Sequence, residues 1–140
     1  MAEEASRKTG VIVRAADKLK AIDPRVLHVA PLTIVCDCFV ICHGRSLTHV
    51  DAFADGIEEL GQEHGMEPLR RDRRADAKWI VLDYGDVMAH VFTEEARRFY
   101  NLEGLWSEAD SVPLTDFLSG VAAEGDTEEV TDASGDRGPG

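Results

Sequence analysis

The sequence predicts an α+β fold in which layers of helices flank a mixed β-sheet of about four strands. Apolar residues recur first with helical spacing, then in two extended runs, and then with helical spacing again. Two β-rich runs joined by a tight turn and one more helical segment follow. The order helix, strand, strand, helix, hairpin, helix therefore places helices against one sheet.

The first predicted helix lies close to the N-terminus. Its apolar residues recur at intervals of three and four, at Val11, Ala15, Leu19 and Ile22. Pro24 should stop the helix, because the residue before a proline disfavours the α conformation. A short strand is predicted at residues 26–29.

A longer strand and a second helix come next. Residues 34–42 are almost wholly apolar apart from Asp37, which indicates a central strand covered on both faces. The strand ends at Gly44, and Ser46 can cap the helix after it. That helix has one apolar stripe, which consists of Val50, Phe53, Ala54, Ile57 and Leu60. Gly65 should end it.

The segment from residue 67 to residue 78 shows no hydrophobic period. It contains four arginines among acidic and small residues, namely Arg70, Arg71, Arg73 and Arg74. We interpret it as a mobile basic loop. Because Asp72 and Asp76 are interleaved with the arginines, a solvated connection is favoured over a contact with RNA.

A β-hairpin is the clearest local prediction. Residues 79–84 and 87–92 are β-rich, and the pair Gly85-Asp86 between them suits a two-residue type II′ turn. The turn fixes the register of the two strands. The face that belongs against a helix is wholly apolar and pairs Tyr84 with Val87, Leu82 with Ala89 and Ile80 with Val91.

The opposite face of the hairpin is also largely apolar, although it carries two polar groups. It pairs Asp83 with Met88, Val81 with His90 and Trp79 with Phe92. A domain of this size has few helices to cover both faces, and Trp, Met, Phe and His together are typical of protein-docking surfaces. We therefore expect either a docking face here or cover by the first helix or the C-terminal segment.

The last predicted helix begins after Thr93, which can cap it, and runs through Tyr100. Glu94 and Glu95 in its first turn complement the positive end of the helix. Three apolar residues after this helix are expected to close the core: Leu102, Leu105 and Trp106.

One domain is predicted at residues 1–107, followed by an acidic, largely disordered tail at residues 108–140. The net charge of the chain is −12, and the tail, with nine acidic residues and one basic residue, contributes −8 of it. Within the tail, residues 112–121 can form a short amphipathic piece. This charge predicts repulsion from naked RNA and attraction to basic proteins, although a tail that merely aids solubility explains the composition as well.

Several classes of protein do not fit the composition. No apolar stretch approaches the roughly 18 residues of a membrane span, and the acidic N-terminus does not suit a secretory signal, so we expect a cytoplasmic protein. The clustered Cys36, Cys38 and Cys42 do not suit a disulfide framework. Same-face neighbours on a strand lie about 7 Å apart, so buried thiols are favoured over a metal site with His43, and no cofactor is expected.

Nucleotidyltransferases are the enzyme class that deserves the closest comparison. Residues 44–46 lie between a strand and a helix, where backbone N–H groups can hold phosphate. The chemistry also needs paired carboxylates that hold two metal ions. Asp51 and Asp55 lie on the predicted helix instead, while the hairpin places Asp83 on a strand face and Asp86 in the turn. We therefore expect no catalytic residues and no enzyme.

Two blocks of sequence carry a resemblance to a known family, DPRVLHVAPLTIVCDCFVICHGRS at residues 23–46 and WIVLDYGDVMAHVFTEEARRFYNLEGLW at residues 79–106. With their surroundings, about residues 10–107, they resemble the RsfS/Iojap family of ribosomal silencing factors. The resemblance implies a mixed sheet flanked by helices, like the nucleotidyltransferase fold but without its catalytic carboxylates. It also implies binding to ribosomal protein fourteen of the large subunit, where the small subunit would dock. That position blocks subunit joining, so translation falls when nutrients are scarce.

Carried over by position, the family's partner-facing hairpin corresponds to Trp79, Asp83, Tyr84, Asp86, Met88 and His90. Its acidic side chains can pair with basic side chains of the ribosomal protein, and Trp79 supplies buried area. We expect neither a membrane nor a specific nucleic-acid sequence as partner, and an exposed hairpin or sheet edge would permit a homodimer of the free protein. The alternatives are a metal-dependent nucleotidyltransferase and an adaptor protein that recruits a basic partner.

Overall fold

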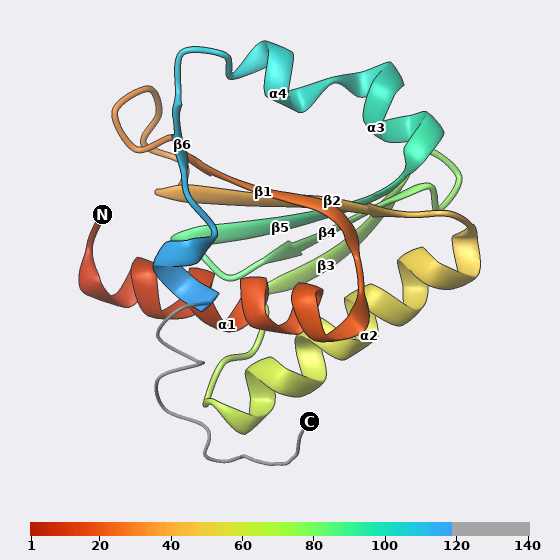
Figure 1. The fold of residues 1–140 in the computed structure, drawn as a ribbon, viewed down its shortest axis with the longest axis horizontal. Helices are drawn as coiled ribbons and strands as arrows, with labels where there is room; N and C mark the ends of the chain where they lie inside the picture. Colours follow the sequence, from red (N-terminus) through yellow and green to blue (C-terminus); the bar gives the residue numbers. More distant parts are fainter. Residues whose placement is uncertain (119–140) are drawn as a thin grey trace.

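The chain folds around a six-stranded mixed β-sheet with helices on both faces (Figure 1). The computed structural model describes residues 1–118. Its helices are α1 (Glu3–Leu19), α2 (Leu47–Glu63), α3 (Glu94–Tyr100) and α4 (Leu102–Leu105). Its strands are β1 (Ile22–His28), β2 (Cys38–Gly44), β3 (Arg70–Arg74), β4 (Trp79–Asp83), β5 (Val87–Thr93) and β6 (Asp110–Val112). The predicted α+β class is confirmed, with a larger sheet than expected.

The strands follow the order β3-β4-β5-β2-β1-β6 across the sheet. β2 and β5 run parallel, and the other neighbouring strands run antiparallel. All residues of β2 are buried, as expected for a central strand between two layers of helices. α1 and α2 cover one face of the sheet, and α3 and α4 lie over the other (Figure 1).

β2 starts later than the sequence predicted. The prediction of a strand over residues 34–42 is wrong in its first part, because Ile34 and Val35 are exposed in a loop. The loop folds back on itself, and the backbone N–H groups of Val29 and Ala30 both donate to the carbonyl oxygen of Asp37, at 2.9 and 3.1 Å. Apolar composition could not reveal this turn, because a run of apolar residues has no period that distinguishes a strand from another apolar segment.

α1 is longer than predicted, and β1 begins earlier. α1 starts at Glu3, well before Val11, and ends at Leu19. Ile22, which the helical spacing assigned to the first helix, belongs to β1 instead. The register between β1 and β2 shifts around Pro24, so a residue without an N–H group is accommodated at an irregular position of the strand.

The hairpin prediction is confirmed. β4 and β5 pair in the predicted register, from Trp79 opposite Phe92 to Asp83 opposite Met88. Gly85 has a φ angle of +91°. A positive φ at the first turn position is what a type II′ turn requires, and glycine adopts it without strain.

The caps of α2 and α3 also match the prediction. Ser46 Oγ accepts a hydrogen bond from the backbone N–H of His49, and Thr93 Oγ1 accepts one from Ala96, each at 3.2 Å. Each bond satisfies one of the free N–H groups in the first turn of its helix. Just beyond the end of α2, Gly65 has a φ angle of +74°, as expected for a residue that stops a helix.

The segment predicted to be a mobile basic loop contains β3, so that prediction was wrong. β3 is an edge strand that pairs antiparallel with β4. Arg71 and Arg73 point from β3 toward α2, where they form ion pairs with the acidic residues Asp51, Asp55 and Glu58. Hydrophobic periodicity could not reveal this strand, because charge pairing rather than apolar burial sets its pattern.

The sheet continues past residue 107, where we expected the domain to end. β6 pairs with the outer side of β1, and Figure 1 shows the chain crossing there from the α3–α4 side to α1. Phe117, within the predicted amphipathic piece, is buried beside Gly10 of α1. The acidic composition around these short segments hid their contribution to the fold. Residues 119–140 of the predicted tail lie outside the described residues.

The short helix α4 closes the core only in part. Leu102 is buried, and Trp106 packs against the same cluster, as expected. Leu105 is exposed, contrary to the prediction, because the single turn of α4 directs only Leu102 into the core. None of the helices within residues 1–118 is long and apolar enough to cross a membrane.

Candidate protein-docking face

One side of the hairpin carries partly exposed side chains that belong to Trp79, Asp83 and Met88. Together with Asp86, which lies in the turn and whose carboxylate reaches Lys8 of α1 on the opposite side of the sheet, these residues are called the hairpin face below. α3 and α4 lie over the same side of the sheet as Trp79 (Figure 1). The side chains of the hairpin face nevertheless remain only half-buried. Four of the six residues predicted to face a partner therefore lie at the surface, and the other two are buried.

The indole ring of Trp79 is held by contacts on several sides. It stacks on Phe92 with ring centroids 4.9 Å apart, and its centroid lies 5.1 Å from that of Tyr100. The guanidinium group of Arg74 lies 5.3 Å from the ring centroid, within cation–π distance. Trp79 Nε1–H donates a hydrogen bond to Nδ1 of His90 at 3.2 Å. The ring is therefore partly exposed and held in one orientation.

His90 lies beneath the hairpin face rather than on it. Its side chain is 5% exposed, and Phe39 meets its ring edge-on with centroids 4.8 Å apart. Burial lowers the pKa of His90 to about 3, so the ring is neutral at physiological pH. A partner cannot reach this ring while Trp79 and its neighbours keep these positions.

Tyr84 points to the other side of the sheet, into the core formed with α1 and α2. Its side chain is 3% exposed and lies beside Gly61 of α2. Burial raises the pKa of Tyr84 to about 12. Tyr84 is therefore not part of the hairpin face, because side chains alternate between the two sides of a strand.

Both acidic residues of the hairpin face are already paired within the chain. Asp83 forms an ion pair with Arg70 at 3.0 Å and accepts a hydrogen bond from the backbone N–H of Gly85 at 2.8 Å. Asp86 pairs with Lys8 of α1 at 2.8 Å. Neither pair is fully buried, since Arg70 is 67% exposed and Asp86 is 28% exposed, so a cationic partner can reach both carboxylates and compete for them.

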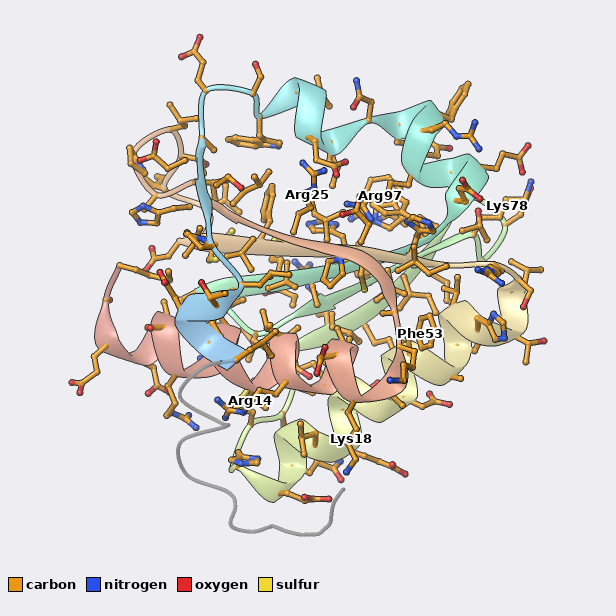
Figure 2. All side chains as sticks on the ribbon, viewed as in Figure 1. Arg14, Lys18, Arg25, Phe53, Lys78 and Arg97 are labelled. Carbon is orange, nitrogen blue, oxygen red and sulfur yellow. The ribbon has the colours of Figure 1, made fainter. Side chains whose placement is uncertain are left out.

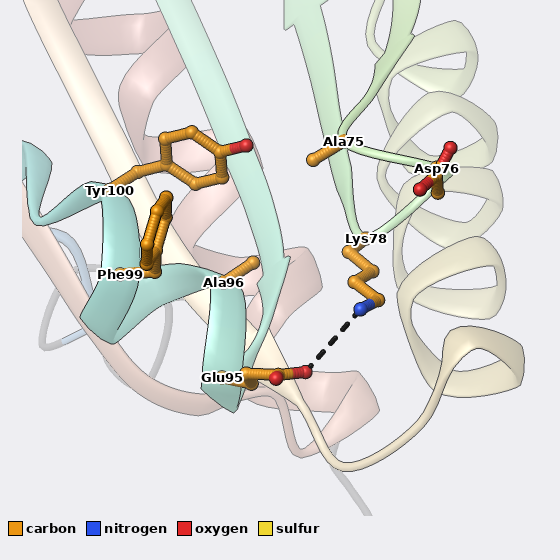
Figure 3. Close-up of a pocket in the computed structure, with 7 residues that line it drawn as sticks. All are labelled: Ala75, Asp76, Lys78, Glu95, Ala96, Phe99 and Tyr100. Atoms are coloured by element: carbon orange, nitrogen blue, oxygen red, sulfur yellow. Dashed lines mark hydrogen bonds and ion pairs between the residues drawn. The ribbon is translucent and has the colours of Figure 1, made fainter.

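A surface cleft adjoins the hairpin face, between α3 and the turn from β3 to β4 (Figure 3). It is lined by Ala75, Asp76, Lys78, Glu95, Ala96, Phe99 and Tyr100. Lys78 Nζ and Glu95 Oε1 lie 3.5 Å apart across it, and Tyr100 links it to Trp79. Sequence reasoning missed the cleft because distant segments form it. The exposed aromatic side chain of Phe99 is the local signal that points to it.

The turn around Ser46 does not assemble the pair of carboxylates that a nucleotidyltransferase needs. Each of the four carboxylates considered for that role forms an ion pair with a lysine or an arginine. The space beside Gly44 is filled by Phe53, whose ring would lie 2.9 Å from a Cβ atom at that position. Within residues 1–118, no three histidine, cysteine or acidic side chains gather as a metal site requires.

The three cysteines are free and buried, as predicted. Cys36 packs on the α3–α4 side of the sheet, whereas Cys38 and Cys42 pack on the α1–α2 side. Burial raises the pKa of Cys36 and Cys42 to about 12, so both remain thiols. Since the thiolate is the form that binds metals and attacks electrophiles, these residues act as apolar packing groups.

Comparisons with known proteins agree with one another. A sequence profile described as "Ribosomal silencing factor during starvation" matches residues 2–138. The chain is 38% identical over 107 residues to ribosomal silencing factor RsfS of Halalkalibacterium halodurans. The match covers 76% of this chain and 92% of that protein. The chain is 32% identical over 103 residues to the chloroplastic protein Iojap of Zea mays, over 74% of this chain and 45% of that protein. A crystal structure of a Bacillus halodurans protein that is 35% identical superposes on this chain with a TM-score of 0.67. The match covers 77% of this chain and 98% of the Bacillus halodurans chain.

The profile spans nearly the whole chain, and the solved relative shares both sequence and fold with it. The role named for the family is ribosome silencing, a form of translation regulation. The two sequence blocks around the central strand and the hairpin had already suggested the same relationship. This chain belongs to the ribosomal silencing factor family, RsfS, to which the Iojap proteins are related.

Proposed function

We propose that the protein represses translation in the cytoplasm by binding the large ribosomal subunit and hindering the joining of the small subunit. The proposed contact is between the hairpin face and ribosomal protein fourteen of the large subunit. The observation that carries this proposal is the half-buried Trp79, held in one orientation on a side of the sheet that the helices leave partly open. Family membership and the sequence resemblance supply the ribosomal partner.

Trp79 and Met88 form the apolar centre of the proposed contact. Tryptophan is among the residue types that contribute most to binding when a partner covers them completely. The flexible thioether of methionine adapts to the shape of a partner surface. Most of the binding energy is therefore expected to come from burial of these two side chains.

The carboxylates of Asp83 and Asp86 give the contact its charge preference. When a basic partner binds, its cationic side chains replace Arg70 and Lys8 as the ion-pair partners of the two carboxylates. One ion pair is lost for each one formed, so the net gain in ion pairing is small. Complementary charge at the rim of an interface mainly raises the association rate, and salt screens it. Added salt should therefore slow association more than it speeds dissociation.

Silencing of this kind needs no chemical step. A bound protein excludes the small subunit by occupying space, so the silenced fraction of large subunits equals the occupied fraction. Occupancy depends on the free concentration of the protein relative to its dissociation constant. Silencing should therefore rise with the abundance of the protein and reverse when it dissociates.

We also propose that the free protein associates with a second copy through the hairpin face. The sheet edges suit this less well, because β3 presents four arginines in five residues and β6 is only three residues long. A dimer of this kind competes with the large subunit for the same surface. Sedimentation velocity over a range of concentrations should show a dimer that Trp79→Ala weakens, and an equally stable dimer in the variant would place the interface elsewhere.

The first test is co-sedimentation of the purified chain with separated large and small ribosomal subunits. We expect pelleting with large subunits alone, lost in Trp79→Ala and retained in Leu47→Ala. Leu47 is the matched control, because it is a partly exposed apolar residue on α2, across the sheet from the hairpin face. Pelleting with neither subunit contradicts the proposal, as does equal binding by both variants.

A second test identifies the partner. A photo-crosslinking residue at position 88 should label ribosomal protein fourteen, because Met88 lies at the apolar centre of the proposed contact. Labelling of ribosomal RNA or of another protein instead would contradict this part of the proposal. Light scattering of mixed subunits then measures joining, which the wild-type chain should inhibit in proportion to occupancy.

A further inference from the structure

His90 accepts the hydrogen bond that the indole of Trp79 donates. An indole N–H is a donor without acceptor capacity, so the 3.2 Å contact between Trp79 Nε1 and His90 Nδ1 requires Nδ1 to be unprotonated. The neutral ring then carries its proton on Nε2. In the part of the chain that the structure describes, this Nε2 is buried without a hydrogen-bond partner.

The surroundings of His90 make histidine an unfavourable choice for packing alone. Phe39 meets its ring edge-on, Phe92 stacks at 6.4 Å between centroids, and Val81 lies opposite on β4. A buried donor without a partner destabilises a fold, and phenylalanine would fill a similar volume without that donor. The hydrogen bond from Trp79 gives histidine an advantage at this position that phenylalanine lacks.

We infer that His90 is a positioning residue for docking, which sets the orientation of Trp79 without touching the partner. This inference rests on the proposed function, in which Trp79 is the main contact. Stacking on Phe92 and the tilted contact with Tyr100 hold the plane of the indole, but an indole flipped over in the same plane makes similar ring contacts. The hydrogen bond distinguishes the two orientations, because one of them directs Nε1 toward His90 and the other directs it away.

A fixed orientation strengthens docking because the partner need not order the ring itself. Without the acceptor at His90, Trp79 samples both orientations, and part of the population cannot bind. The apparent dissociation constant then rises by the inverse of the competent fraction. Removal of the acceptor should therefore weaken docking without removing any atom that the partner touches.

Two substitutions separate positioning from packing, because they act in opposite directions. His90→Phe keeps the ring volume and removes the acceptor, so its unfolding temperature should equal or exceed that of the wild type. Its affinity for large subunits should nevertheless fall about three- to tenfold. His90→Asn places an acceptor near the position of Nδ1 but leaves a cavity, so it should unfold at a lower temperature and keep its affinity within about twofold.

The indole N–H resonance of Trp79 in nitrogen-15 NMR spectra gives a readout that does not depend on the ribosome. In His90→Phe this resonance should shift and exchange faster with water, while that of Trp106 serves as an internal reference. His90→Asn should preserve more of the wild-type shift than His90→Phe does. A Trp79 resonance and an affinity that both stay unchanged in His90→Phe would overturn the inference.

The inference would also be overturned if the affinities of His90→Phe and His90→Asn for large subunits rise and fall with their unfolding temperatures. A residue that contributes only packing changes affinity and stability together. Trp79→Ala separates the two claims. If Trp79→Ala binds large subunits like the wild type, the proposed function fails and His90 loses its role in docking. The NMR comparison still decides in that case whether His90 orients the indole.

Discussion

Trp79 is held on several sides and yet remains partly exposed. The ring lies at the edge of the aromatic cluster rather than inside it, so truncation should leave the fold largely intact. Trp79→Ala should weaken binding to the large subunit by about 1–3 kcal/mol, the range for truncation of a dominant contact. Titrations of labelled protein against large subunits measure this loss. Unfolding of the variant would show instead that Trp79 is a core residue.

His90 should make stability depend on pH on the acid side of neutrality. Its pKa of about 3 in the folded protein lies below the unfolded value of about 6.5, so the unfolded chain takes up the proton first as the pH falls. The folded state therefore loses stability below pH 6.5 and is unaffected by this group above it. Between pH 7 and pH 5.5, the wild type should lose about 1 kcal/mol more than His90→Phe.

Urea denaturation of both proteins at the two pH values measures this difference. His43, whose pKa is also lowered by burial, is present in both proteins and cancels in the comparison. Equal losses in the wild type and in His90→Phe would mean that His90 is not held neutral by burial.

Arg97 joins α3 to the sheet and to α4 (Figure 2). Its side chain is 8% exposed, donates two hydrogen bonds to Glu103, and contacts the carbonyl oxygen of Ile22 and Nδ1 of His43. Arg97→Met keeps most of the volume but leaves these acceptors without a donor. It should lower the free energy of unfolding by about 2–3 kcal/mol, since Glu103 is partly exposed to water.

Arg98 provides the matched control for this prediction, because it is the next residue on α3 and is mostly exposed. Arg98→Met should change the free energy of unfolding by less than about 0.5 kcal/mol. Similar losses in the two variants would contradict a structural role specific to Arg97. Thermal and urea denaturation are both suitable measurements.

At the scale of elements, the hairpin turn determines which side chains reach the hairpin face. Gly85→Ala should lower the free energy of unfolding by about 1–2 kcal/mol, because φ of +91° is strained for a residue with a Cβ atom. The new Cβ meets nothing closer than Leu69, at 3.6 Å, so backbone strain rather than a clash causes the loss.

Gly61 in α2 is the opposite case. A Cβ atom there would make only ordinary contacts, at 3.4 Å or more. Gly61→Ala should therefore raise the free energy of unfolding by up to about 1 kcal/mol, because alanine favours the helix more than glycine does. If Gly85→Ala and Gly61→Ala shift the denaturation curve in the same direction, this account of the two glycines is contradicted.

At the scale of the whole molecule, β6 and Phe117 extend the fold beyond residue 107. A chain that ends at residue 107 loses the pairing of β6 with β1 and uncovers the site that Phe117 fills beside α1. It should be less stable than the full chain by about 3 kcal/mol, as expected for loss of a buried phenylalanine. A chain that ends at residue 118 retains both features and is the control. Equal melting temperatures of the two truncated chains would contradict this prediction.

Prediction from the sequence succeeded wherever a local signal was sufficient. The glycine at position 85 and the two β-rich runs predicted the register of the hairpin, and Ser46 and Thr93 predicted the starts of two helices. It failed where distant residues decided the structure. β3 is held by backbone pairing with β4, and its Arg71 and Arg73 meet acidic residues of α2, a long-range arrangement that has no local pattern.

The sequence by itself determined the fold class, the hairpin and its two faces, and the resemblance that led to the family. These follow from backbone preferences and from the alternation of side chains along a strand, which operate over a few residues. Only the tertiary structure decided which residues of the hairpin remain accessible. It buried His90 beneath Trp79, and it packed α1 and α2 over the face to which the hairpin register had already assigned Tyr84, because exposure depends on what the rest of the chain packs against each face.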